Sequence, residues 1–150
     1  MPRARTLLPF LLLVMVGGLF IGYVTRPGEW YAALAKPAFN PPNAVFAPVW
    51  TLLYILIAIA GARTYQRAAS SMAMRAWWLQ LVLNFLWSPI FFVAHQISLA
   101  FVVILALLAT IFAFIRGCWD TDRPAALLFV PYAAWVAFAA LLNGSIMVLN

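Results

Sequence analysis

Charged residues are scarce in this chain. Only 8% of its 150 residues are charged, 67% are hydrophobic, and aspartate and glutamate together number 3. An ordinary soluble domain carries about 25% charged residues. The composition therefore excludes that class and favours a protein embedded in a bilayer. Residues 1–150 are expected to form a single domain, because about 100–200 residues is the usual domain size.

Residues that support redox or metal chemistry are also rare. Cys118 is the only cysteine, which excludes an internal disulfide and a paired-cysteine redox site. Glu29, Asp120 and Asp122 all fall between apolar stretches, so the membrane carboxylates typical of proton relay are missing, and no metal site is expected. His95, the only histidine, is a candidate haem-iron ligand. An ordinary histidine at the membrane surface is favoured, since its ring has an apolar body and a polar tip.

The few positive charges indicate an orientation. The net charge of +6 is compatible with nucleic-acid binding, but the basic residues are scattered between apolar runs and form no basic groove, so this function is excluded. If the N-terminus is cytoplasmic, only Arg26 and Lys36 fall on the outer side, and the C-terminus lies outside. The inner side then carries Arg3, Arg5, Arg63, Arg67, Arg75, Arg116 and Arg123. A bacterial inner membrane is favoured, because outer-membrane proteins are normally barrels.

Long apolar runs account for most of the chain. A helix needs about 20 apolar residues to cross the hydrocarbon core. The first run lacks a cleavage pattern and reaches full spanning length, so we expect a membrane helix rather than a cleaved signal peptide. The sequence thus predicts an all-α bundle of five transmembrane helices, near Thr6–Thr25, Val45–Thr64, Ala76–Ala94, Leu99–Gly117 and Ala125–Leu149.

The connection between the first two helices, Arg26–Asn43, differs from the other, shorter turns. It combines four prolines with aromatic residues: Pro27, Pro37, Pro41 and Pro42 with Trp30, Tyr31 and Phe39. Proline fixes φ and lacks an N–H donor, so we predict a stiffened loop rather than a helix. Long ordered loops are often functional, which favours a lid over a passive linker.

Aromatic and amide residues recur at helical spacing in three of the predicted helices. Residues four apart share one helix face. A buried amide is costly in lipid without a partner, so Asn84 and Asn143 should face the bundle interior. The presence of any single aromatic residue is explained by the belts of Trp and Tyr at membrane interfaces. Three stripes beside an aromatic loop instead favour a pocket for a flat apolar ligand such as a porphyrin or a sterol. The stripes are Phe46, Trp50 and Tyr54; Asn84, Trp87, Ser88, Phe91 and His95; and Tyr132, Trp135, Ala139 and Asn143.

Proline and glycine inside the helices shape the bundle. Pro89 and Pro131 each remove a helical hydrogen bond, and we expect kinks that widen a cavity. Gly18 and Gly22 form a small-residue face, which serves close packing inside the bundle or dimerisation equally well.

Taken together, these motifs resemble the tryptophan-rich sensory protein/translocator protein family over nearly the whole chain. The matching residues are Trp30-Tyr31, Lys36-Pro37, Asn40-Pro41-Pro42, Val45-Phe46, Pro48-Val49-Trp50-Thr51, Tyr54, Gln80-Leu81, Asn84-Phe85, Trp87-Ser88-Pro89, Phe91-Phe92, Pro131-Tyr132, Trp135, Phe138-Ala139 and Leu142-Asn143.

The resemblance implies a five-helix bundle that binds porphyrins under the first loop, with no required cofactor. Benzodiazepine-type synthetic ligands and a homodimer are further expectations. The family's sterol-recognition segment carries Tyr followed by Arg or Lys, but residues 142–150 contain neither, so cholesterol is not expected as the natural ligand. The implied ligand-binding residues are Trp30, Tyr31, Phe46, Trp50, Tyr54, Asn84, Trp87, Phe91, Trp135, Ala139 and Asn143.

Three functions remain open at this point. The leading one is a receptor, sensor or translocator of porphyrins. The second is light-dependent porphyrin breakdown, for which Tyr31 and Trp135 are the catalytic candidates. The third is a structural or partner-binding membrane subunit, with Gly18 and Gly22 at an interface.

Overall fold

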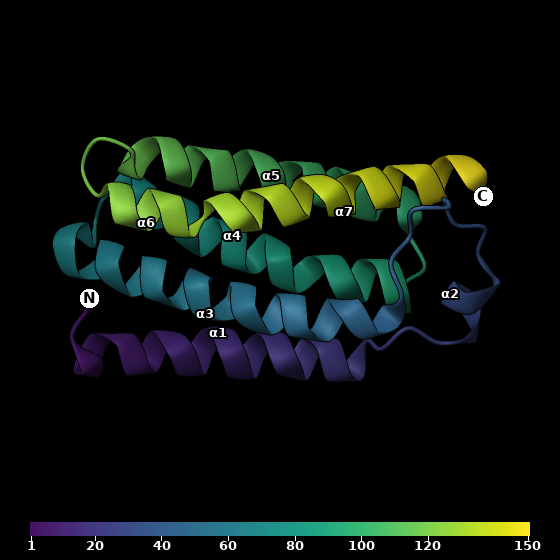
Figure 1. Ribbon diagram of the computed structural model, residues 1–150, viewed down its shortest axis with the longest axis horizontal. Coiled ribbons are helices and arrows are strands. Elements are labelled where there is room, and N and C mark those ends of the chain that lie inside the picture. Colours follow the sequence, from purple (N-terminus) through teal and green to yellow (C-terminus); the bar gives the residue numbers. More distant parts are fainter.

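The computed structural model describes residues 1–150 as an all-helical bundle (Figure 1). Its elements are α1 (Ala4–Val24), α2 (Glu29–Ala33), α3 (Asn43–Ala68), α4 (Met72–Ser88), the π-helical turn η1 (Pro89–Val93), α5 (Ile97–Cys118), α6 (Arg123–Leu128) and α7 (Val130–Leu149). Five stretches are long and apolar enough to cross a membrane: α1, α3, α4 with η1, α5, and α6 with α7. The predicted five-helix membrane fold is confirmed, and the chain is a multi-pass membrane protein.

The helices start earlier than predicted, and two of them end later. For example, α3 begins at Asn43 and ends at Ala68, whereas hydropathy predicted Val45–Thr64. Backbone hydrogen bonding continues past the apolar stretch, because a helix end in the polar interface can carry amides and arginines. Ser71 caps α4, since its Oγ accepts a hydrogen bond from the Met74 amide at 3.1 Å.

The spanning helices lie roughly along one axis, with α1 at an edge of the bundle (Figure 1). α1 packs mainly on α3, while α5 packs on α4 and α7. The turns α3–α4 and α5–α6 lie at the same end as the N-terminus, and α2 lies at the other end with the C-terminus (Figure 1). The segment before α3 is therefore placed to cover one end of the bundle.

One close approach between helices depends on glycine. The Trp77 ring is fully buried, and its Nε1 donates a hydrogen bond to the Ile57 carbonyl at 3.0 Å. A Cβ at Gly61 would collide with this indole. Gly61 is thus needed for α4 to lie against α3, and the buried indole N–H is satisfied within the bundle.

Regular helical geometry is interrupted at both predicted prolines, Pro89 and Pro131, whereas α1 and α3 continue through Pro9 and Pro48. Pro89 begins the π turn, in which the Ala94 amide donates to the Pro89 carbonyl at 2.9 Å. Pro131 lies in the first turn of α7, directly after the break at Phe129 that separates α6 from α7. At both points the missing proline N–H donor removes one α-helical hydrogen bond.

The prediction for Arg26–Asn43 is wrong in one part, because Glu29–Ala33 forms the short helix α2. This stretch lies between Pro27 and Pro37 and contains no proline, so nothing blocks a single helical turn. The rest of the segment is irregular, as predicted.

Gly18 and Gly22 on α1 differ in their surroundings. Gly18 is buried, and a Cβ there would collide with the Tyr54 ring of α3, so this glycine serves packing inside the bundle. A Cβ on Gly22 would meet nothing within 4 Å. Close contact between α1 and α3 therefore needs only the first of the two.

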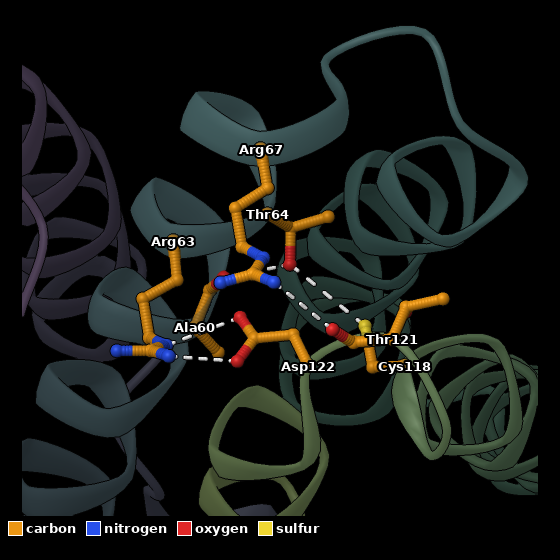
Figure 2. A network of polar contacts seen from close by, with 7 residues as sticks. All are labelled: Ala60, Arg63, Thr64, Arg67, Cys118, Thr121 and Asp122. Carbon is orange, nitrogen blue, oxygen red and sulfur yellow. Dashed lines mark hydrogen bonds and ion pairs between the residues drawn. The ribbon is translucent and has the colours of Figure 1, made fainter.

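A polar network joins α3 to the α5–α6 turn at the N-terminal end of the bundle (Figure 2). The Arg63 guanidinium donates to both carboxylate oxygens of Asp122, at 3.1 and 2.7 Å. Arg67 donates to the Thr121 carbonyl at 3.1 Å. Asp122 is only 6% exposed, so this bidentate ion pair is largely shielded from water.

Candidate ligand cavity

A cavity of about 450 Å³ lies between the helices at the end covered by the loop. Ligand pockets for small molecules typically have volumes of about 300–1,000 Å³. The walls come from α1, α3, α4, η1, α5 and α7, and the segment before α3 contributes Arg26, Pro27, Tyr31 and Asn40. The chain thus encloses a space of ligand size, mostly with apolar side chains.

Residues from all three predicted stripes line this cavity, but Tyr132 and His95 do not. Phe46, Trp50 and Tyr54 line it from α3; Asn84 and Trp87 from α4; Phe91 from η1; and Trp135, Ala139 and Asn143 from α7. Neighbouring rings contact each other edge to face, as Phe46 does with Trp135 at 5.8 Å between centroids. Trp87 stacks on Phe91 at 5.2 Å. The structure therefore brings together all the predicted ligand-binding residues except one.

The exception is Trp30, which does not line the cavity. Its ring stacks on His95 with centroids 4.0 Å apart and planes 10° apart, and it contacts Phe91 edge to face. Trp30 thus anchors α2 to the end of η1. His95 is exposed and lies outside the cavity, in agreement with an interfacial histidine.

The covering segment is held at several points. Tyr31 is buried against Phe91 and Phe92, with centroids 6.2 and 5.3 Å apart. At the far side of α2, the Asn150 side chain donates to the Ala35 carbonyl at 2.9 Å and accepts from the Ala35 amide at 3.1 Å. These contacts give the segment the position of a lid, as its composition predicted.

The two cavity amides differ in how they are used. Asn143 Oδ1 accepts from Trp87 Nε1 at 3.0 Å, and Asn143 Nδ2 donates to the Ile97 carbonyl at 3.1 Å. This amide therefore joins α4, α5 and α7. Asn84 donates from Nδ2 to the Tyr132 hydroxyl at 2.7 Å, which leaves Oδ1 available. Both amides are buried in the interior, as predicted.

Two buried polar atoms that belong to cavity residues have no partner in the protein. They are Nε1 of Trp135 and Oδ1 of Asn40. A buried polar atom without a partner costs about 1–3 kcal/mol. Trp135 thus has an unused hydrogen-bond donor and Asn40 an unused acceptor, both in residues that line the cavity.

Sequence reasoning missed the contribution of α1 and α5. Gly18, Gly22 and Thr25 line the cavity from α1, and Ile104 and Leu107 line it from α5. These residues are small or aliphatic and carry no chemical signature. Only the glycine spacing gave a signal, and it did not say what the glycines would face.

The fold and the cavity define a class: a multi-pass membrane protein whose five spanning helices enclose an aromatic cavity beneath a loop. The chain belongs to the TspO/MBR family, whose model matches residues 10–149. It is 38% identical over 133 residues to protein CrtK of Rhodobacter capsulatus, covering 86% of this chain and 83% of that relative. It is 37% identical over 129 residues to the tryptophan-rich sensory protein of Cereibacter sphaeroides, covering 86% and 82%. It is 35% identical over 142 residues to the translocator protein of Ovis aries, covering 89% and 83%.

Proposed function

We propose that this membrane protein binds a porphyrin-type tetrapyrrole in the cavity under residues 26–43, as a receptor, sensor or translocator. The observation that carries the proposal is a cavity walled by aromatic rings, one of which, Trp135, has a buried Nε1 without a partner. A flat apolar molecule with a few polar atoms matches this combination. Family membership and the names of the relatives support a sensory or translocating role.

The aromatic walls favour a ligand with an extended π-system. Trp50 from α3, Trp87 from α4 and Trp135 from α7 line the cavity from three helices. Aromatic faces prefer offset-stacked or edge-to-face partners, worth about 0.5–1.5 kcal/mol each beyond area burial. A tetrapyrrole has faces and edges large enough to contact several of these rings at once.

The proposal is tested by titrating protoporphyrin IX into detergent-purified protein and following porphyrin absorbance. Trp135→Phe keeps an aromatic ring but removes the N–H, and one lost hydrogen bond is worth about 0.5–1.5 kcal/mol. We expect affinity to fall about twofold to tenfold. Trp78→Phe is the matched control, because Trp78 is 42% exposed on α4 and does not line the cavity.

The double variant Trp50→Phe/Trp135→Phe should weaken binding further than either single change. Unsaturable partitioning, or an unchanged affinity in the double variant, would overturn the proposal and leave the partner-binding subunit as the better explanation.

Light-dependent breakdown of bound porphyrin is a second candidate. It is favoured by one observation: the two oxidisable candidates, Tyr31 from the covering segment and Trp135 from α7, line the same cavity. Porphyrin bleaching under illumination in air would then slow in Tyr31→Phe and Trp135→Phe at equal ligand occupancy. Equal bleaching rates in the three proteins would remove this candidate.

We further propose a bacterial inner-membrane location with a cytoplasmic N-terminus. The end of the bundle with the N-terminus carries most of the arginines, and the lid end has Arg26 and Lys36. In Cys118→Ser protein, a membrane-impermeant maleimide should label Ser98→Cys in intact spheroplasts and label Ser70→Cys only after permeabilisation. The reverse pattern would refute the orientation.

A further inference from the structure

Charge is unevenly distributed at the end of the bundle that carries the N-terminus. Most of the arginines lie there, but the carboxylate side chains at this end, Asp120 and Asp122, both belong to the α5–α6 turn. Asp122 pairs with Arg63, and Asp120 lies 3.5 Å from Arg116 and 4.0 Å from Arg123. The carboxylates therefore neutralise arginines of α3, α5 and α6, and none of α1 or α4.

Two exposed arginines, Arg3 at the start of α1 and Arg75 in α4, have no carboxylate within ion-pair distance. The Arg3 amide donates to the Gln66 side chain at 2.6 Å, which holds the start of α1 against the end of α3. The Arg75 guanidinium contacts the Met72 sulfur of its own helix at 3.7 Å, and a thioether is a weak acceptor. Both cations are thus available to an anion outside the protein.

An aromatic patch made of Phe10, Tyr65 and Trp78 lies close to these arginines. The buried Phe10 ring of α1 is 5.6 Å from Tyr65 of α3 and 5.8 Å from Trp78 of α4, measured between centroids. Tyr65 is 48% exposed and Trp78 is 42% exposed. Half-exposed Tyr and Trp rings are typical of the membrane interface, where one end is apolar and the other is wet.

Helical spacing places the two arginines above the aromatic patch. Arg75 is three residues before Trp78, and Arg3 is seven residues before Phe10, so each arginine shares a helix face with a ring. At 1.5 Å per residue, the arginines lie about 5–10 Å nearer the end of the bundle than the rings. A headgroup layer is about 5–8 Å thick, so the cations can reach a lipid phosphate while the rings contact its acyl chains.

We propose that Arg3 and Arg75 bind the phosphate of an anionic phospholipid whose acyl chains lie against the aromatic patch. A lipid fits better than a free anion, because only a molecule with an apolar part can cover the half-exposed rings. A zwitterionic lipid fits less well, since its ammonium group adds positive charge beside two arginines. The positive-inside rule accounts for the number of arginines at this end, but it predicts no selectivity for one lipid.

This site is separate from the cavity, because none of its residues lines the cavity. The inference therefore does not depend on porphyrin binding.

Native mass spectrometry of the detergent-purified full chain tests the site with two lipids that carry the same acyl chains. We expect phosphatidylglycerol to bind more tightly than phosphatidylcholine. Arg3→Gln and Arg75→Gln should each weaken phosphatidylglycerol binding about fivefold, the value of one arginine near a lipid phosphate. The double variant should bind more weakly than either single variant. Arg3→Gln keeps the backbone hydrogen bond to Gln66, so the position of α1 is preserved.

Arg116→Gln is the matched control. It removes the same charge at the same end of the bundle from a side chain that is 81% exposed, but Arg116 pairs with Asp120 and lies on α5. Phosphatidylglycerol affinity should change little in this variant. Arg75→Lys keeps the charge and should keep most of the affinity.

Trp78 reports independently where the lipid binds. Phosphatidylglycerol brominated on its acyl chains should quench part of the tryptophan fluorescence saturably, and Trp78→Phe should remove most of that part. Equal affinities for the two lipids, or equal losses in Arg75→Gln and Arg116→Gln, would overturn the inference and indicate diffuse attraction to a basic surface. Displacement of the lipid by millimolar inorganic phosphate would also overturn it, because the rings would then contribute nothing.

Discussion

Replacing Asp122 by alanine should destabilise the bundle far more than the same change at Asp120, its neighbour in the same turn. Asp122 accepts two hydrogen bonds from Arg63, and the two side chains are only 6% and 20% exposed. The Asp120 carboxylate is 73% exposed and is 3.5 Å from Arg116 and 4.0 Å from Arg123. The two carboxylates therefore differ mainly in burial and hydrogen-bond geometry.

The expected magnitudes follow from that difference. Breaking a buried ion pair costs about 3–5 kcal/mol, because the remaining charge has lost its partner. Arg63 keeps some contact with water, so we expect about 2–3 kcal/mol for Asp122→Ala after discounting for screening. An exposed pair is worth about 0–1 kcal/mol, which bounds the effect of Asp120→Ala. For a chain of this size, about 2–4 °C of melting temperature corresponds to each 1 kcal/mol.

The assay can use the lone cysteine. Cys118 is buried next to Thr64 in the same network, so a thiol-reactive fluorophore reports when this end of the bundle opens (Figure 2). Far-UV circular dichroism of the detergent-solubilised protein gives the global transition. We expect Asp122→Ala to melt about 4–12 °C lower by both probes. A shift no larger than that of Asp120→Ala would refute the argument from burial.

Two further predictions concern the cavity and its lid. Gly18→Ala places a Cβ against the Tyr54 ring, which lines the cavity and must shift, so protoporphyrin affinity should fall several-fold. Gly28→Ala is the control, because a Cβ there meets nothing within 4 Å and Gly28 does not line the cavity, and equal losses in both variants would contradict this reasoning. Asn150→Ala removes both hydrogen bonds to Ala35, so the lid should open more often and bound porphyrin should dissociate faster. Stopped-flow dissociation measures this, and an unchanged rate would mean that other contacts hold the lid.

Hydropathy was sufficient to predict the five spanning helices. Lipid leaves a chain few alternatives, because every backbone N–H and C=O inside it needs a partner within the protein. The short helix α2 was missed for the opposite reason: five residues are too few to show a helical period. Helix ends were missed by a few residues because an arginine or asparagine in the interface ends the apolar run without ending the helix.

The cavity residues with rings and amides could also be predicted, because their four-residue spacing gathers them on one face of each helix. The spacing does not predict which hydrogen-bond partner each buried amide has. Asn84 and Asn143 carry the same side chain, yet their hydrogen bonds differ. Asn143 bonds through both its oxygen and its nitrogen and bridges helices, whereas Asn84 bonds through its nitrogen only. That difference depends on Tyr132 and Trp87, which lie 48 and 56 residues away from their respective amides.

The π turn at the end of α4 determines which residues of this helix face the lid. A π turn takes up one more residue than an α turn, so it changes the rotational phase of whatever follows. Before the turn, the packing of the bundle fixes the phase of Asn84 and Trp87. Within it, Phe91 and Phe92 both contact Tyr31, although neighbouring residues on a regular α-helix do not share a face. Deleting the extra residue would therefore rotate Phe91 and Phe92 away from Tyr31 while Asn84 and Trp87 kept their positions.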